Sequence, residues 1–154
     1  MSKFKIVALG GTFDIVHKGH LALLQQGFSI SSKVIIGLTS DEFAIKKEKK
    51  LLHNYSQRLE SLESAINKNF PNSHYEISKL DNDFGPAILN NEVEALVVSE
   101  ETVAQGEVLN KLRSQRHLLP VTVVSVPMAL AKDGKRLSTT RIKNSEIDIE
   151  GNLR

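Results

Sequence analysis

The stretch FKIVALGGTFDIVHKGH, residues 4–20, decides the fold of this chain. Residues 4–9 form an apolar run of strand length, two glycines follow, and apolar residues recur at helical spacing from residue 21 onward. A buried strand, a glycine turn and a helix start present backbone N–H groups at the positive end of the helix dipole. The stretch therefore predicts a binding site for a phosphate or a similar anion.

Two histidines, His17 and His20, lie three positions apart in this turn, so both side chains can reach the same side of the first helical turn. Gly19 lets an anion approach the backbone without meeting a Cβ, and Gly10 and Gly11 permit the sharp exit from the strand. A lone His-x-x-His pair more often marks two surface histidines, but its position after a strand and a double glycine favours a ligand site. A zinc site is the least favoured interpretation, since the chain has no cysteine and no further ligand cluster at metal spacing.

The composition predicts one globular domain. A length of 154 residues and a hydrophobic content of 40% suit a single domain over residues 1–150 with a polar tail at 151–154. A formal charge of +2 gives no strong nucleic-acid footprint. Without cysteines, a signal-type segment or an 18-residue apolar run, we expect a cytoplasmic protein with no membrane partner.

Apolar runs alternate with helical patterns along the rest of the chain. We expect strands at residues 4–9, 33–38, 75–80, 95–98 and 121–126, and helices from residue 21, over 55–70 (opened by Ser56), at 87–90 and over 99–115. This order predicts an α/β fold, a doubly wound five-stranded parallel sheet with helices on both faces. The lysine-rich residues 44–50 follow the carboxyl end of a strand, where open α/β sheets bind ligands, so one lysine can reach the site.

A second polar cluster, LSTTRI at residues 137–142, opens a short helix near the chain end. Hydroxyl residues at a helix start most often cap backbone N–H groups. Here the hydroxyls of Ser138, Thr139 and Thr140 coincide with Arg141, which together offer amides, hydroxyls and a guanidinium to phosphate oxygens. The cluster therefore predicts a second phosphate-binding site.

GGTFD followed by HKGH resembles the HxGH signature of the nucleotidyltransferase superfamily, which transfers a nucleotidyl group from a nucleoside triphosphate to a phosphate-bearing acceptor. LSTTRI resembles the ISSTxxR-like segment of the same superfamily. In this alignment Lys143 takes the place of the arginine, and Arg141 falls at a variable position. The resemblance implies a Rossmann-like nucleotidyltransferase fold in which His17 and His20 bind the triphosphate and stabilise charge on its α-phosphate.

Most of the chain resembles the archaeal and eukaryotic type of phosphopantetheine adenylyltransferases. The segments that carry this likeness are GGTFDIVHKGH, IGLTSDEF, YSQR, LDNDFGPA, LVVSEET, DGKRLSTTRI and SEID, the last with serine where glycine is usual. The resemblance implies transfer of AMP from ATP to 4′-phosphopantetheine in coenzyme A biosynthesis, by direct in-line attack without a covalent intermediate. Because the attacking phosphate is already anionic, positioning and charge stabilisation suffice. Mg²⁺ is expected to accompany ATP.

The same resemblance assigns roles to individual residues. The implied catalytic residues are His20, His17 and Lys46; the implied nucleotide-binding residues are Gly10, Gly11, Thr12, Phe13, Gly19, Glu101, Asn110, Ser138, Thr139, Thr140 and Arg141; and the acceptor would be bound by Thr12, Lys46 and Asp81. Sequence alone does not separate Lys46 from its neighbour Lys47 as the lysine that holds the acceptor phosphate.

Two alternatives remain open. One is another nucleotidyltransferase of the superfamily, such as a cytidylyltransferase for glycerol phosphate or an FMN adenylyltransferase, because GGTFD and HxGH are common to all of them. LDNDFGPA and LVVSEET favour the pantetheine reaction. The other is a nucleotide-sensing module without catalysis, which the two histidines and the hydroxyl cluster argue against. The oligomeric state is left open, with a monomer preferred.

Overall fold

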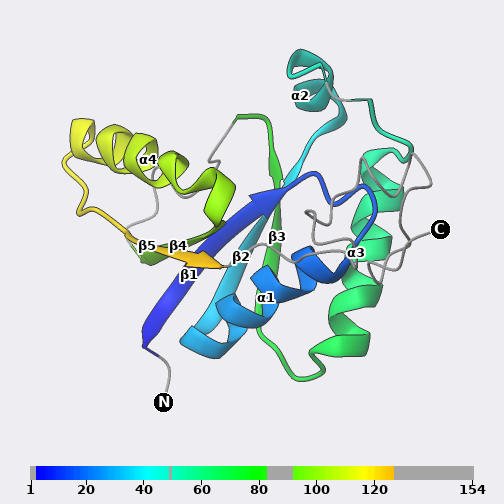
Figure 1. Ribbon diagram of the computed structural model, residues 1–154, viewed down its shortest axis with the longest axis horizontal. Coiled ribbons are helices and arrows are strands. Elements are labelled where there is room, and N and C mark those ends of the chain that lie inside the picture. The colour runs from blue at the N-terminus through cyan, green and yellow to red at the C-terminus, as the bar shows by residue number, and fades with distance from the viewer. Residues whose placement is uncertain (1–2, 49, 83–91, 127–154) are drawn as a thin grey trace.

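The computed structural model describes residues 3–48, 50–82 and 92–126. Five parallel strands form one sheet in the order β3-β2-β1-β4-β5 (Figure 1). The strands are β1 (Phe4–Gly11), β2 (Ser31–Thr39), β3 (Tyr75–Leu80), β4 (Val93–Ser99) and β5 (Thr122–Val126); the helices are α1 (Lys18–Ile30), α2 (Asp41–Lys46), α3 (Tyr55–Asn69), the 3₁₀ turn η2 (Glu100–Thr102) and α4 (Ala104–Gln115). The predicted Rossmann-like parallel sheet is confirmed.

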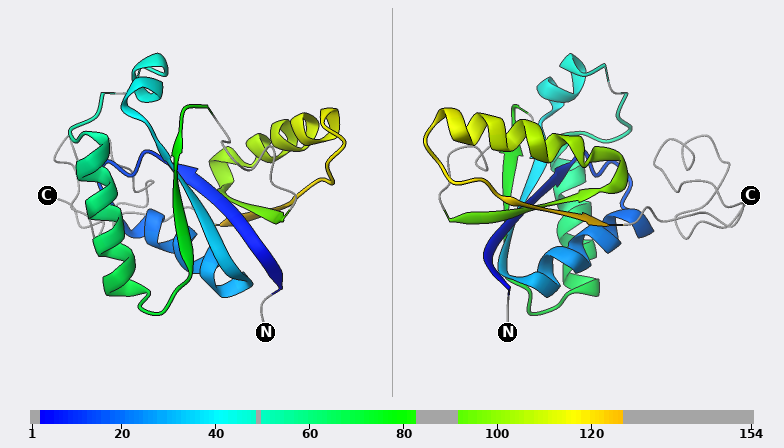
Figure 2. Two further views of the ribbon diagram at one scale, coloured as in Figure 1. Left: turned by 180° about the vertical axis from the view of Figure 1, so that it is seen from behind. Right: turned by 60° about the vertical axis from the view of Figure 1, so that its left-hand side comes forward.

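Helices cover both faces of this sheet, as Figure 2 shows. On one face, Leu24 of α1 and Leu62 of α3 pack with Val7 of β1. On the other face, Leu109 of α4 packs with Ala8 of β1. Because alternate residues of a strand point to opposite faces, one apolar run supplies both cores. No described helix is long and apolar enough to cross a membrane.

The strand order places a crevice at the end of β1. The chain passes from β1 to β2 and β3 on one side, and then returns to β4 on the other side of β1. At such a reversal of strand order, loops diverge beyond the carboxyl ends of the strands and leave room for a ligand. The predicted anion-binding turn leaves β1 at this point.

Two helix starts differ from the predictions. Helix α3 begins after Asn54, whose side chain accepts a hydrogen bond from Gln57 N at 2.9 Å, so the expected opening by Ser56 is wrong. The single helix expected over residues 99–115 is divided into η2 and α4. The Thr102 hydroxyl accepts from Ser99 N at 3.2 Å and closes a short 3₁₀ turn before α4 starts. The expected helix at 87–90 lies outside the described residues.

Candidate active site

A buried aromatic ring holds the turn between β1 and α1 in a strained conformation. Phe13 has a φ of +48°, which non-glycine residues rarely adopt, and its side chain is fully buried. Its ring centroid lies 4.8 Å from that of His20. Burial of the ring thus offsets an unfavourable backbone angle and fixes an aromatic surface beside one of the predicted histidines.

The two histidines cap helix α1 reciprocally. His17 is the N-cap residue, and its Nδ1 accepts a hydrogen bond from Gly19 N at 3.1 Å. In return, His17 N donates to Nδ1 of His20 at 3.2 Å. The rings stack with centroids 3.9 Å apart. The imidazoles therefore take the places that a hydroxyl and a carboxylate occupy in an ordinary capping box.

These hydrogen bonds assign the tautomer of both rings. A ring nitrogen that accepts a hydrogen bond carries a lone pair, so each neutral imidazole has its proton on Nε2. Burial, reinforced by the adjacent His17 ring and opposed by a hydrogen bond with the Ile15 backbone, lowers the pKa of His20 to about 3. Near neutral pH, His20 is therefore an uncharged N–H donor and not an imidazolium ion.

A cavity of about 360 Å³ lies at the predicted crevice. Its polar lining side chains come from the ends of β1, β2 and β4 and from the helices that follow them. They are Thr12, His20, Thr39, Lys47, Ser99, Thr102 and Gln105. Gly10 and Gly11 also line it, so the cavity is bordered by the glycine turn, one histidine and a lysine. This set of groups suits a phosphate-bearing ligand.

Of the two candidate lysines, the structure brings Lys47 to the cavity. Both lysines are exposed, and helix α2 ends at Lys46, which is not one of the described residues that line the cavity. Lys47 lines it and holds its ammonium group 4.9 Å from the centroid of the Phe43 ring. A cation at this distance from an aromatic face is attracted by the ring quadrupole, which orients the lysine.

Other predicted residues lie elsewhere. Phe13, His17 and Gly19 belong to the turn, but among the described residues they do not line the cavity. Asn110 pairs with the backbone of Val121, accepting from its N–H at 2.7 Å and donating to its carbonyl at 3.1 Å. Asp81 is exposed just after β3. The side chain of Glu101 and the residues Ser138, Thr139, Thr140, Arg141 and Lys143 lie outside the described part of the structure.

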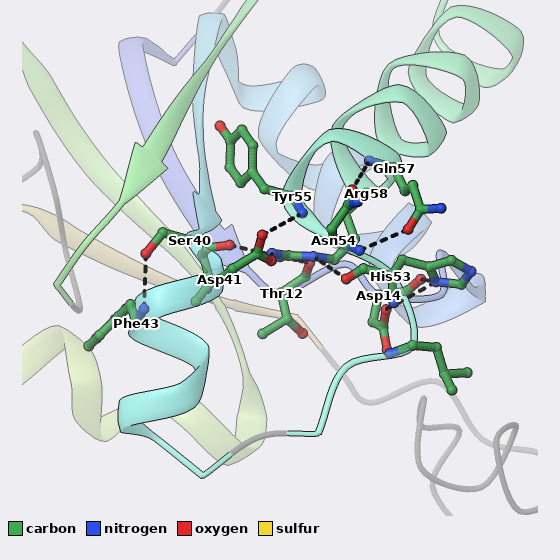
Figure 3. A network of polar contacts seen from close by, with 12 residues as sticks. Thr12, Asp14, Ser40, Asp41, Phe43, His53, Asn54, Tyr55, Gln57 and Arg58 are labelled. Atoms are coloured by element: carbon green, nitrogen blue, oxygen red, sulfur yellow. Dashed lines mark hydrogen bonds and ion pairs between the residues drawn. The ribbon is translucent and has the colours of Figure 1, made fainter.

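Asp14, which the sequence analysis did not single out, joins the turn to the loop before α3. Its buried carboxylate accepts from Leu52 N at 2.9 Å and from His53 N at 3.0 Å (Figure 3). The ring Nδ1 of His53 lies 3.1 Å from the same carboxylate. This loop follows the lysine segment, so Asp14 limits the positions that the segment can take.

Arg58 is the last residue of the YSQR segment that resembles the family, and its spacing along α3 also indicates that it is buried. It lies four and eight residues before Leu62 and Ile66, which share the buried face of α3. A charged residue on an apolar helical stripe requires partners, because a buried unpaired charge is very costly. Ser99, Thr102 and Gln105 gave no comparable signal, since residues of these types are typical of any helix start.

The fold is that of a nucleotidyltransferase. A family model described as cytidylyltransferase-like matches residues 8–145, and the chain belongs to this family. An Archaeoglobus fulgidus protein of unknown function has a crystal structure with a TM-score of 0.71 and 29% identity, covering 80% of this chain and 89% of that one.

Relatives at higher identity identify the branch of the family. The phosphopantetheine adenylyltransferase of Methanothermobacter thermautotrophicus is 36% identical over 98% of this chain and 90% of its own length. That of Pyrococcus abyssi is 38% identical over 99% of this chain and 97% of its own length. The family expected from the sequence is therefore confirmed.

Proposed function

We propose that this chain is a pantetheine-phosphate adenylyltransferase, which converts ATP and 4′-phosphopantetheine into dephospho-coenzyme A and pyrophosphate in coenzyme A biosynthesis. An oxygen of the acceptor phosphate attacks the α-phosphorus of ATP, and the bond from that phosphorus to the β-phosphate bridging oxygen breaks. The single observation that carries the proposal is the placement of His20 and Lys47 on one cavity at the reversal of strand order. Similarity to adenylyltransferases over nearly the full chain supports the choice of substrates.

His20 would stabilise the charge that develops at the α-phosphate. As a neutral imidazole it can donate its Nε2–H to a phosphate oxygen without first having to lose or gain a proton, in exchange for the hydrogen bond that the ring makes with the Ile15 backbone. The ring is already fixed by the His17 N–H on one side and the Phe13 ring on another, so little reorganisation is needed. His17 would act mainly by holding the His20 ring, against which it stacks.

Lys47, in place of Lys46, would bind the phosphate of the acceptor together with Thr12. Both residues line the cavity. An ammonium group is a compact charge suited to a dianionic phosphate, and the Thr12 hydroxyl can donate to the same group. Gly10 and Gly11 line the same cavity.

The β- and γ-phosphates of ATP would be held by Ser138, Thr139 and Thr140, as the family resemblance implies. Mg²⁺ would enter with ATP, with phosphate oxygens and water as its main ligands. The described cavity lining offers threonine and serine hydroxyls as neutral oxygen ligands, so the charge on such an ion would be balanced mainly by the phosphates of ATP. When bound, the ion would offset negative charge on the triphosphate.

Pyrophosphate release on mixing the purified chain with ATP, Mg²⁺ and 4′-phosphopantetheine tests the proposal. Matched reactions contain CTP in place of ATP, or glycerol phosphate or FMN in place of the acceptor. We expect release only with ATP and phosphopantetheine, and formation of dephospho-coenzyme A in equal amount. Release with another pair would assign a different nucleotidyltransferase activity, and nucleotide binding without release would make the chain a sensing module.

We also expect a cytoplasmic monomer that works without a nucleic-acid or membrane partner. A formal net charge of +2 supports the lack of a nucleic-acid partner. Light scattering coupled to size exclusion checks the monomer, and a doubled mass would contradict it.

A further inference from the structure

Arg58 is a fully buried arginine on the first turn of α3 that makes four side-chain hydrogen bonds (Figure 3). Its Nη1 donates to the carbonyl of Thr12 at 2.9 Å and to the carbonyl of Thr39 at 2.7 Å. Its Nη2 donates to Oδ1 of Asp41 at 2.8 Å, and its Nε donates to the carbonyl of His53 at 3.2 Å. One guanidinium therefore joins the start of α3 to three segments, which are the loop just before this helix, the end of β2 with the start of α2, and the distant turn after β1.

The first of these partners belongs to the histidine side of the site. The Thr12 carbonyl immediately precedes Phe13, whose φ is positive, in the turn that leads to His17 and His20. A hydrogen bond to this carbonyl fixes the orientation of a peptide plane at the strained position. Arg58 thereby restrains the turn that presents His20.

The other partners belong to the lysine side of the site. Thr39 ends β2, and Asp41 opens α2, which Lys47 terminates as its C-cap residue. Weak burial acts to raise the pKa of Asp41, but the Tyr55 N–H and Arg58 outweigh it and hold the pKa below its usual value. The ion pair is thus present at neutral pH, and it ties the start of α2 to the guanidinium.

The planar fork of arginine is what allows both sides to be held at once. Its N–H groups point in fixed directions, whereas the ammonium group of a lysine is a single point that cannot reach all four acceptors. Arg58 itself is not one of the described residues that line the cavity. Its effect on a ligand must therefore pass through the backbone segments that it holds.

We propose that Arg58 is a positioning residue, which sets the distance between the phosphates of the two substrates. It does so by joining the turn that carries His20 to helix α2, at whose end Lys47 lies. This proposal rests on the proposed function, because it assigns ATP to the turn and the acceptor to Lys47. Replacing Arg58 should leave both substrates able to bind but misaligned for attack. A misplacement on the order of 1 Å can lower turnover by about 100-fold.

The chain offers a matched control, Arg113, which is also almost completely buried. Its Nε donates to the carbonyl of Leu119 at 2.8 Å, and its Nη2 lies 3.5 Å from the carbonyl of Val93, the first residue of β4. These partners lie at the amino-terminal end of the strand, away from the carboxyl ends that border the cavity. Loss of this arginine should lower stability without changing the alignment of substrates.

The experiment compares Arg58→Lys with Arg113→Lys by thermal unfolding and by kcat and KM for both substrates, at a temperature where each variant is fully folded. We expect both to unfold at lower temperature, Arg113→Lys to keep kcat within about twofold, and Arg58→Lys to lose on the order of 100-fold in kcat with smaller changes in KM. A kcat for Arg58→Lys within about threefold of the unchanged chain would overturn the proposal.

A double variant separates positioning from general destabilisation. If Arg58 acts by placing Lys47, then Arg58→Lys combined with Lys47→Ala should lower kcat/KM for the acceptor by less than the product of the two single effects. Effects that multiply fully would overturn the proposal. Absence of pyrophosphate release by the unchanged chain would instead refute the proposed function, so the two failures are distinguishable.

Discussion

In both halves of the sheet, buried side chains form hydrogen bonds with backbone groups, but they do so at opposite ends of the strands. In the half formed by β1, β2 and β3, Arg58 binds backbone groups at the carboxyl ends of β1 and β2, and Asp14, in the turn after β1, binds backbone groups of the loop before α3. In the half formed by β4 and β5, Arg113 and Asn110 bind backbone groups near the strand starts. Buried side-chain hydrogen bonds can thus either position a ligand site or stabilise the core. The end of the strands at which they lie indicates which role they have.

The largest effect on kcat is expected from His20→Ala, at the end of the sheet that borders the cavity. Loss of a preorganised donor should lower kcat by about 100-fold or more while the fold persists. His74→Ala is the matched control, because His74 is exposed in the loop before β3 and should leave kcat unchanged. Steady-state pyrophosphate release measures both. Equal turnover in His20→Ala would remove this residue from the mechanism.

The next effect distinguishes the two lysines. Lys47→Ala should raise KM for phosphopantetheine by about 10-fold or more, the scale of a charge-assisted hydrogen bond. Lys46→Ala should change it by less than about twofold, since Lys46 is not one of the described residues that line the cavity. Titration calorimetry with the acceptor alone gives the same comparison. The reverse ranking would restore Lys46, as the family resemblance implied.

The pH dependence of stability follows from the pKa of His20, which lies near 3 when the chain is folded and near its ordinary value of about 6.5 when it is unfolded. Between these values the unfolded chain binds a proton that the folded chain does not. The free energy of unfolding should therefore fall as the pH falls from about 6.5 to 3, by up to about 1.4 kcal/mol per pH unit from this group.

Denaturant unfolding at pH 7, 5 and 4 measures this loss. In His20→Asn, whose side-chain oxygen can still accept from the His17 N–H, the contribution of this group should vanish. Identical pH dependence of the unchanged chain and of His20→Asn would show that His20 has the same pKa in the folded and in the unfolded chain.

The smallest effect on activity is expected at the opposite end, from Asn110→Ala. This change leaves the buried N–H and carbonyl of Val121 without their partner and should cost about 1–3 kcal/mol of unfolding free energy. Neither kcat nor KM for ATP should change by more than about twofold. A raised KM for ATP with unchanged stability would favour the nucleotide contact that the resemblance implied.

Much of the fold could be predicted because it depends on local patterns. The apolar run at residues 75–80 coincides with β3, and the run at 33–38 lies within a slightly longer β2. The start of α3 was misplaced because Asn54 and Ser56 are both good N-cap residues, and only the hydrogen bond from Gln57 N identifies Asn54.

The site was less predictable because its residues meet through the tertiary structure. Lys46 and Lys47 are equivalent in sequence, and which one faces the cavity depends on where α2 ends. Asn110 acquires its partner from a strand that follows a loop, which no short motif records. Arg58 could have been found from its place on the apolar face of α3, although its four partners could not.

Because His17 and His20 cap helix α1, the first turn of this helix must be intact for His20 to be held in its reactive position. The same two N–H···N bonds that start α1 also keep the ring nitrogens in a single protonation pattern. Fraying of this first turn would free both rings to rotate and to exchange protons with solvent. Amide hydrogen exchange at Gly19 should therefore report how often the first turn of α1 opens and the two histidines lose their catalytic arrangement. This local opening should occur more often than unfolding of the whole molecule.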